Sequence, residues 1–313
     1  MLWGLDFRKD YRRVCEIVCL LDEVPTLMLT ATATNAVKAD VCNVLAVEDA
    51  AVIARLPNRP NIFLHLLKVK ENFEEELSWL IGCLKKGQTK CPKILVYCRN
   101  VRAVYQMYMW VMEELGDQAY AGRHHSVDCR LVEMFHSKAD QESMERIMTN
   151  FPKEDSHIRL LFATIAFGMG VQINDVDIVV HWGLEQSALQ YWQEVGRCAR
   201  DGRPGLAVTY ALSRTITTCK DKAMKEVATC STCCRVQLLQ MFAIDSAGAE
   251  ELETLKLKSN CEQNCLQMCQ CALCSCCSNC QVDCCCPSRA SSFLERLEKM
   301  YVVFLTCFKI LAF

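Results

Sequence analysis

The stretch KILVYCRNVRAVYQMYMWVMEEL, residues 93–115, decides the fold class. It opens with Lys93–Cys98, a short apolar run rich in branched residues, which is typical of a buried strand. The residues that follow carry apolar side chains at the i, i+3, i+4 and i+7 spacing, which predicts a helix with one apolar face. The apolar positions of this helix are Val101, Val104, Tyr108, Val111, Met112 and Leu115.

Other apolar runs of the same kind occur along the chain, each followed by residues with helical spacing. Strands that alternate with helices imply a mainly parallel sheet covered by helices on both faces. We therefore predict an α/β fold, with the strand pattern stopping after about Ser213. The further runs are Thr26–Thr30, Ile158–Ala163, Val176–His181 and Leu206–Ala211.

Length and composition limit the class of protein. The chain has 313 residues, which at about 150 residues per domain predicts roughly two domains. Apolar residues make up 51% of the chain and charged residues 23%, a composition that excludes general disorder. Because 35 Lys and Arg are balanced by 37 Asp and Glu, any nucleic-acid site must be local.

Cysteine is unusually abundant, with 24 residues, eleven of them between Cys261 and Cys286. A disulfide framework, a metal site or a low-complexity segment would each account for this density. Met1–Arg8 has no basic start followed by an apolar run, which predicts no secretory signal and disfavours disulfides. The apolar Tyr301–Phe313 is shorter than the roughly 20 residues that a transmembrane helix needs, so we expect none.

A polar stretch with two prolines, Leu56–Asn61, is typical of a linker between two units. The segment before it is too short for an independent α/β domain. We therefore expect this segment to be the end of a domain whose earlier strands are missing.

Two turns that follow predicted strands are rich in small residues. Ligands of parallel sheets gather at the carboxyl ends of the strands, so these turns are candidate sites. The Thr hydroxyls of Leu29–Thr34 could bind phosphate or could cap the next helix. The glycines of Ala163–Gly170 could present N–H groups to an anion or could form an ordinary turn.

A third turn, Ser187–Gly202, carries the strongest charge pattern. With Ser187 as helix N-cap, helical geometry would place Gln193, Arg197 and Arg200 on one face. Two guanidiniums and an amide on one face would form an anion clamp, since the planar fork of arginine suits phosphate. A solvated charged face, with nearby carboxylates as partners, is the alternative.

In this order, the motifs resemble those of the RecQ family of superfamily 2 DNA helicases, over roughly residues 1–215. Trp3–Arg8 resembles the end of that family's aromatic-rich loop, Leu29–Thr34 resembles motif III, and Ile94–Arg99 resembles motif IV. Phe135–Ser137 resembles the short signature after motif IV, Ala163–Gly170 resembles motif V, and Gln193–Gly202 resembles motif VI.

The resemblance implies two RecA-like domains, with ATP bound between them and single-stranded DNA crossing both. Residues 1–57 would be the remnant of the first domain and residues 58–213 the complete second domain. Residues 214–290 would form a small α-helical, Cys-rich zinc-binding module, followed by a tail, 291–313, of unknown role.

The resemblance also implies roles for individual residues. Arg197 and Arg200 would reach the γ-phosphate of ATP, and Gln193 would couple the nucleotide state to domain closure. The expected cofactor-binding residues are Gly168, Gly170, Asp201 and Gly202. The expected nucleic-acid contacts, with stacking by the two aromatic residues, are Trp3, Phe7, Thr32, Arg99, His136, Ser137 and Thr164.

The sequence departs from the family pattern in several places. It contains no Gly-x-x-x-x-Gly-Lys-Ser/Thr phosphate loop, and Asp22–Pro25 imitates the acidic Mg²⁺-binding motif in the wrong order. We therefore expect a C-terminal portion of the enzyme that does not hydrolyse ATP alone. Ala199 stands where the family usually has Gly, which a helical turn should tolerate, and Gln172 stands where an Asp is common.

Members of the RecQ family commonly carry a zinc module after the second domain, with a Cys-Arg pair followed by Cys-x-x-Cys-x-x-Cys. By this resemblance the Zn²⁺ ligands would be Cys234, Cys274, Cys277 and Cys280, four thiolates suited to tetrahedral zinc. Rival spacings are offered by Cys230, Cys233, Cys271, Cys276 and Cys284. A segment without metal remains the alternative.

Our leading hypothesis is therefore that the chain is part of an ATP-dependent 3′–5′ DNA helicase, with ATP and Mg²⁺ as cofactors and Zn²⁺ in the Cys-rich module. It would act on single-stranded or forked duplex DNA, away from membranes, in the nucleus. A non-catalytic protein that binds nucleic acid or a partner is the main alternative. A Cys-rich secreted protein, with oxidised thiols, is a weaker third.

Overall fold

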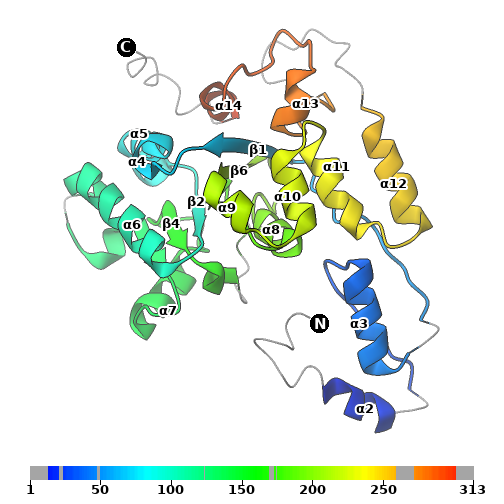
Figure 1. Cartoon of the computed structure of the whole chain (residues 1–313). Helices are drawn as coiled ribbons and strands as arrows, with labels where there is room; N and C mark the ends of the chain where they lie inside the picture. The colour runs from blue at the N-terminus through cyan, green and yellow to red at the C-terminus, as the bar shows by residue number, and fades with distance from the viewer. Residues whose placement is uncertain are drawn as a thin grey trace. The chain divides into compact units, whose positions relative to one another are not determined.

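The computed structural model describes residues 13–20, 24–47, 50–122, 124–168, 173, 175–258 and 271–300. The chain divides into two compact units (Figure 1). The helical unit comprises Met1–Asn58 and Val236–Lys258, and the sheet unit comprises Arg59–Arg235 and Ser259–Phe313. The domain limits expected from the sequence remain a prediction.

The helical unit contains α2 (Val14–Leu20), α3 (Asn35–Leu45) and α12 (Ser246–Lys256). The predicted strand at Thr26–Thr30 is wrong, because this segment is irregular and no described strand pairs with it. Without a neighbouring strand its backbone forms no ladder, and Leu27 and Leu29 are 80% and 84% exposed. Thr34 caps α3 by accepting a hydrogen bond from the Val37 amide at 3.3 Å, which confirms the capping interpretation of this turn.

The sheet unit contains six parallel strands in the order β1-β6-β5-β2-β4-β3. Four of them confirm the predicted strands, whereas β1 and β3 were not predicted. In β3, Glu133 interrupts the apolar pattern, but its buried carboxylate pairs with Arg146 at 2.7 Å. The strands are β1 (Ile62–Val69), β2 (Ile94–Cys98), β3 (Val132–Phe135), β4 (Leu160–Ala163), β5 (Ile178–Trp182) and β6 (Gly205–Leu212).

The helices of the sheet unit follow the strands, as Figure 1 shows. They are α4 (Phe73–Glu76), α5 (Ser78–Gly87), α6 (Val101–Leu115), α7 (Gln141–Asn150), α8 (Ala188–Val195), α9 (Ser213–Thr218), α10 (Lys222–Thr229), α11 (Cys234–Leu239, which spans the boundary between the units), α13 (Ser278–Val282) and α14 (Phe293–Met300). Short 3₁₀ turns are η2 (Gln88–Lys90), η3 (Gly116–Ala119), η4 (Val127–Cys129), η5 (Ile165–Gly168) and η6 (Gln240–Phe242). In the part of the chain that the structure describes, we find no helix with the length and apolarity that crossing a bilayer requires.

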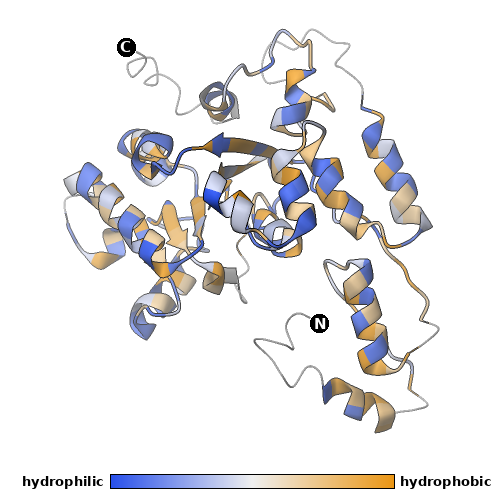
Figure 2. Cartoon of the chain, viewed as in Figure 1, coloured by the Kyte–Doolittle hydropathy of each residue, from blue (hydrophilic) through white to orange (hydrophobic). Residues whose placement is uncertain are grey.

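Helices cover both faces of the sheet, as predicted. On one face, Val96 and Val180 lie in a core cluster with Val104 and Met107 of α6. On the other face, α8 packs through Tyr191, whose ring lies 4.8 Å from that of His181 and whose hydroxyl hydrogen-bonds Thr209 at 2.9 Å. The strands are accordingly mostly apolar, whereas the helices alternate between polar and apolar faces (Figure 2).

The Cys-rich segment covers the outer edge of β1. The Leu64 amide donates to the Cys276 carbonyl at 3.1 Å, and the Leu66 amide donates to the Ser278 hydroxyl at 3.3 Å. An edge strand presents unpaired backbone groups, which this pairing satisfies. Residues 276–278 thus extend the sheet edge by one isolated bridge, while the described chain after Ser213 contains no further strand, as expected.

The turn after α8 corrects two expectations. The helix ends at Val195, with Gly196 as its C-cap, so Arg197 and Arg200 lie in the following turn and not on a helical face with Gln193. Ala199 is not in a helical turn either, because its φ is 45°, in the left-handed region. An L-residue with a Cβ is strained there by about 1–2 kcal/mol, whereas glycine is not.

Replacing this alanine by glycine should therefore stabilise the sheet unit. We expect Ala199→Gly to raise the free energy of unfolding by about 1 kcal/mol and the melting temperature by about 2–4 °C, since the relieved strain outweighs the added freedom of the unfolded chain. Thermal and urea unfolding, followed by circular dichroism, would measure both.

The matched control is Ala103→Gly in the regular helix α6, which should lose about 1 kcal/mol because glycine is a poor helix former. If Ala199→Gly were destabilising like this control, the strain at residue 199 would be disproved.

Candidate functional site

The parallel strands bring four of the predicted nucleic-acid residues to one edge of the sheet. Ala163 of β4 pairs with both Tyr97 of β2 and Phe135 of β3. The residues that follow these strands therefore lie in a row at their carboxyl ends, where parallel sheets bind ligands. This strand-end group consists of Arg99, His136, Ser137 and Thr164.

Members of the strand-end group differ in exposure. Arg99 and Ser137 are exposed, whereas His136 is 7% exposed, and its Nδ1 atom has no hydrogen-bond partner in the part of the chain that the structure describes. The Thr164 amide donates to the Phe135 carbonyl at 3.2 Å, which fixes the start of the next turn. The group thus offers a cation, a hydroxyl and an imidazole along one edge.

The turn after β4 is anchored by an aromatic side chain. Phe167 is buried, with its ring 5.0 Å from that of Phe135 and 5.8 Å from that of Phe151. Gly168, a predicted cofactor-binding residue, ends η5 directly after this anchor. Gly170, predicted with it, lies outside the described residues.

The arginine turn, residues 196–203, is the second candidate group. Its position is set by α8, whose buried Glu194 pairs with His181 of β5 at 2.9 Å. The turn also joins the start of β5, because the Ala199 amide donates to the Val176 carbonyl at 2.7 Å. The arginine turn therefore lies toward the amino end of β5, separated from the strand-end group by the length of α8.

Three guanidiniums converge at the arginine turn. Arg59 and Arg200 both donate to the Gly196 carbonyl, at 3.1 and 3.3 Å. Partial burial and the neighbouring charges of Arg197 and Arg59 lower the pKa of Arg200. Burial raises the pKa of Tyr97, although the charges of Arg197 and Arg200 act against that rise. Concentrated positive charge of this kind is suited to an anion such as a phosphate group.

The sequence analysis missed the residues that shape this turn. Arg59 also donates to the carbonyls of Cys198 and Ala199, at 3.0 and 2.8 Å. Asn61 donates to the carbonyls of Ala199 and Arg203, at 3.0 and 2.8 Å. Both residues belong to the stretch interpreted as a linker, where nothing in their spacing indicated a contact about 140 residues away in the sequence.

Asp201 and Gly202, predicted to bind cofactor, complete the arginine turn. Asp201 accepts hydrogen bonds from the Arg203 amide at 3.1 Å and from its guanidinium at 2.6 Å. Although burial opposes it, these bonds lower the pKa of Asp201. Gly202 has a φ of 86°, which favours glycine. In this structure both residues hold the shape of the turn.

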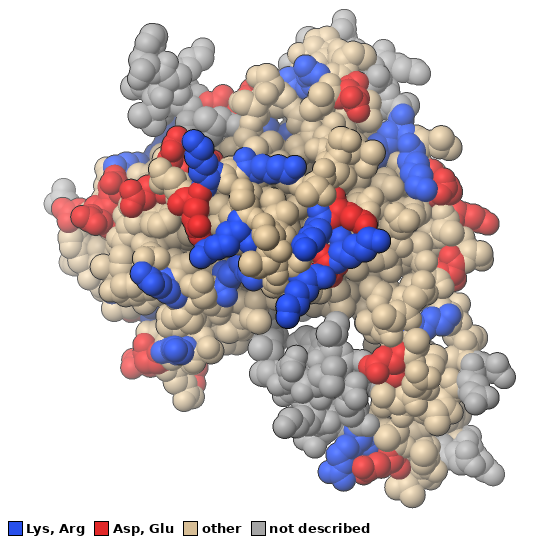
Figure 3. Space-filling view, viewed as in Figure 1, with Lys and Arg blue, Asp and Glu red and all other residues tan. Residues whose placement is uncertain are grey.

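Basic side chains are frequent on the face of the sheet unit that carries α8, α9 and α10, where they lie among fewer acidic ones (Figure 3).

In the helical unit, Thr32 is half-buried, and its carbonyl accepts a hydrogen bond from the Thr30 hydroxyl at 2.9 Å. The predicted base-stacking residues Trp3 and Phe7 lie outside the described residues.

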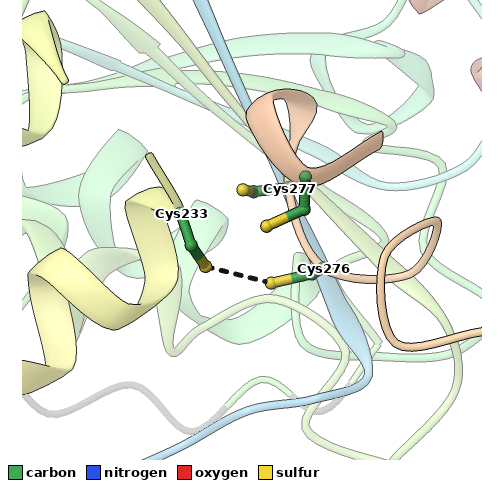
Figure 4. Close-up of side chains that lie close together, drawn as sticks. Cys233, Cys276 and Cys277 are labelled. Carbon is green, nitrogen blue, oxygen red and sulfur yellow. Dashed lines mark hydrogen bonds between the residues drawn. The ribbon is translucent and has the colours of Figure 1, made fainter. Parts of the chain in front are cut away.

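Four thiols gather where the Cys-rich segment meets α11. The Sγ atoms of Cys233, Cys276, Cys277 and Cys280 all lie within 4.8 Å of one another. Cys233 and Cys276 approach to 3.5 Å (Figure 4). Four thiolates bound to zinc at about 2.3 Å would be about 3.8 Å apart, so this group, the first thiol cluster, fits a tetrahedral zinc ion.

This cluster differs from the predicted quartet. Cys277 and Cys280 belong to it, but Cys233 and Cys276 take the places expected for Cys234 and Cys274. Pairing with β1, in addition to sequence spacing, positions Cys276 and Cys277, both of which lie in this cluster. The ligand set expected from the sequence remains a prediction.

The thiols of the first cluster interact strongly. Hydrogen bonds from Cys233, and then from Cys234 and Cys276, lower the pKa of Cys277. Cys234 thus lies beside the cluster although it is not a member. A thiol whose ionised form is favoured is suited to metal binding, because the thiolate is the ligand.

Comparisons with known proteins agree with this geometry. The family model described as the helicase conserved C-terminal domain matches residues 75–202. The structure of Dbp5 from Saccharomyces cerevisiae is similar in fold, with a TM-score of 0.53 and 16% identity, over 82% of this chain and 60% of that one.

Three curated relatives cover the same region. The ATP-dependent DNA helicase RecQ of Pasteurella multocida is 28% identical over 258 residues, which are 77% of this chain and 37% of the relative. The ATP-dependent DNA helicase hus2/rqh1 of Schizosaccharomyces pombe is 30% identical over 208 residues, 66% of this chain and 14% of the relative. A protein of Acanthamoeba polyphaga mimivirus, named as an ATP-dependent RNA helicase, is 32% identical over 202 residues, 64% of this chain and 33% of the relative.

This chain therefore spans between 14% and 37% of the length of these relatives. The matched region includes β2 to β5, the strand-end group and the arginine turn up to residue 202. Residues 75–202 match the helicase conserved C-terminal domain, and the relatives named RecQ, RecS and Q1 support a C-terminal helicase region of RecQ type for this chain.

Proposed function

We propose that this chain supplies the second RecA-like domain of an ATP-dependent 3′–5′ DNA helicase of RecQ type. The observation that carries the proposal is the convergence of Arg59, Arg197 and Arg200 at one turn of a parallel α/β sheet. Hydrolysis of ATP releases energy by transferring the γ-phosphoryl group to water, and cations beside that group stabilise its charge.

In this proposal, Arg197 and Arg200 face the γ-phosphate, and Arg59 holds their turn in shape. Gln193, exposed on the last turn of α8, would contact the opposite domain and relate its nucleotide state to domain closure. The phosphates and Mg²⁺ themselves need a phosphate loop and an acidic residue in the other domain, since the 313 residues contain no such loop.

The strand-end group would bind the DNA backbone. Arg99 offers a phosphate contact, while Ser137 and Thr164 offer hydroxyls, and all three lie at one sheet edge. In the helical unit, Thr32 would contact DNA as well, and by family resemblance so would Trp3 and Phe7, with single-stranded or forked DNA as the substrate. Repeated opening and closing of the two domains would then move the protein along one strand.

Zinc would be bound by the first thiol cluster, Cys233, Cys276, Cys277 and Cys280. The ion would supply structural cross-linking between α11, α13 and the edge of β1, without redox chemistry.

We further propose a nuclear location, which rests on the DNA-processing role of the family. None of the 20 described cysteines forms a disulfide, which is consistent with a reducing compartment.

A non-catalytic protein that binds nucleic acid or a partner is the second candidate. The observation in its favour is the lack of any Gly-x-x-x-x-Gly-Lys-Ser/Thr sequence in these 313 residues. In that case the arginine turn and the strand-end group would act as an anion-binding surface only.

The first test is ATP hydrolysis by the chain of 313 residues. We expect phosphate release with single-stranded DNA to remain at the background level, because nothing in the sequence cradles the β- and γ-phosphates. The double variant R197A/R200A is the matched control and should give the same rate. Turnover by the wild type that disappears in this variant would show that the chain is a complete ATPase.

The second test is DNA binding at the strand-end group. We expect Arg99→Ala to weaken binding of oligo-dT about fivefold at about 0.1 M salt and to reduce the slope of log K against log salt by about 1, because one phosphate contact is lost. Fluorescence anisotropy over a salt series measures both quantities.

Lys90 provides the control for this test, since it is an exposed cation before β2 whereas Arg99 follows it. Lys90→Ala should leave affinity and slope unchanged. Equal losses in the two variants would mean that DNA binds by general charge and not at the strand ends.

A further inference from the structure

A second group of four thiols lies in the Cys-rich segment, apart from the first cluster. The Sγ atoms of Cys271, Cys274, Cys284 and Cys286 all lie within 4.8 Å of one another. The two clusters share no residue, although they interleave in the sequence. The resemblance to the RecQ family accounts for one zinc module and assigns nothing to this second thiol cluster.

The separations within the second thiol cluster match metal binding. The Cys271–Cys284, Cys274–Cys284 and Cys271–Cys286 Sγ pairs lie at 3.5, 3.0 and 3.8 Å. Thiolates on one zinc ion are about 3.8 Å apart, whereas the sulfur atoms of a disulfide are about 2.05 Å apart. No disulfide joins any of these four cysteines. Their arrangement is thus that of four ligands around one point.

Backbone amides also point at these sulfur atoms. The Cys274 amide donates to the Cys271 Sγ at 3.3 Å, and the Cys286 amide donates to the Cys284 Sγ at 3.4 Å. Hydrogen bonds to the ionised form of a ligand favour that form and orient it. In each of the two pairs, Cys271–Cys274 and Cys284–Cys286, one sulfur atom therefore accepts a backbone hydrogen bond that favours its thiolate form.

Little else holds this segment together. Cys274, Cys284 and Cys286 form a separate buried cluster, with Leu273 as its apolar partner besides Cys271. A core of this size buries too little apolar surface to offset the entropy of ordering the chain. A structural metal ion replaces such a core in small modules.

Two arginines bind the backbone next to the ligands. The buried Arg296 guanidinium donates to the Cys274 carbonyl at 2.7 Å, and Arg289 donates to the Cys284 carbonyl at 2.9 Å. Zinc bound by four thiolates carries a net charge of −2, so both cations would be attracted to the site. Arg296 also lies over the Phe63 ring at 3.5 Å, which links the cluster to β1.

We propose that Cys271, Cys274, Cys284 and Cys286 form a second, structural zinc site. Binding forms four Zn–S bonds, and the thiol protons displaced by the metal go to solvent, with no oxidation or reduction. All four coordination positions are filled by protein, so the site is closed and stabilises the fold. It fastens residues 271–286 to α14 and to the edge of β1.

Metal content of the full chain tests the proposal. After removal of loosely bound metal, mass spectrometry should find two zinc ions per wild-type chain, one in Cys284→Ser and one in Cys280→Ser. Cys285→Ser is the matched control, because Cys285 is exposed and belongs to neither cluster. It should retain two ions.

One zinc ion in the wild type that Cys284→Ser retains and Cys280→Ser loses, or two in Cys284→Ser as in Cys285→Ser, would overturn the proposal. If Cys284→Ser does not fold, ¹¹³Cd exchanged into the wild-type chain gives an independent answer. Two resonances in the tetrathiolate range are expected, and a single one would refute the second site. Disulfides among these four cysteines, found after alkylation of free thiols under denaturing conditions, would refute it as well.

Discussion

The sheet unit depends on one buried guanidinium. Arg235 donates to the carbonyls of Arg59 at 2.8 Å and of Cys276 at 3.2 Å, and also to that of Ile62. These carbonyls belong to three segments: the approach to β1, the start of β1 and the Cys-rich segment. Five donors in a rigid plane let one arginine satisfy acceptors from all three, which the flexible single ammonium of lysine does not match. Removing it would leave buried carbonyls unsatisfied, at a cost of about 1–3 kcal/mol each.

Arg235 also connects the thiol clusters to the arginine turn. It fixes the backbone of Arg59, whose own guanidinium binds three carbonyls of that turn. Cys276, at the other side of Arg235, belongs to the first thiol cluster. A contiguous set of hydrogen bonds therefore runs from the cysteines to the residues that the family resemblance assigns to ATP. The first thiol cluster is therefore part of the support of the arginine turn and not merely an appendage.

The sequence predicted those features that depend on local patterns. The apolar runs of β2, β4, β5 and β6, and the helix over Val101–Leu115, needed only short-range periodicity. The family resemblance named the members of the strand-end group, and the parallel direction of the strands explains why these residues share one edge. The predictions failed where distant segments decide the outcome. Arg59 binds a turn far along the chain, and pairing with β1 chooses which cysteines meet. Ala199 shows the same limit, since its left-handed φ is invisible in the residue type.

Helix α8 relates the two candidate groups to each other. Its N-cap, Ser187, lies on the strand-end side, and its last residue, Val195, leads into the arginine turn. Eight helical residues span about 12 Å, which is the length of helix that joins the two groups. Buried contacts to β5 and β6, through Glu194 with His181 and Tyr191 with Thr209, fix the helix along its length. Because a packed helix does not deform easily, a displacement of the arginine turn would carry α8 and the sheet with it.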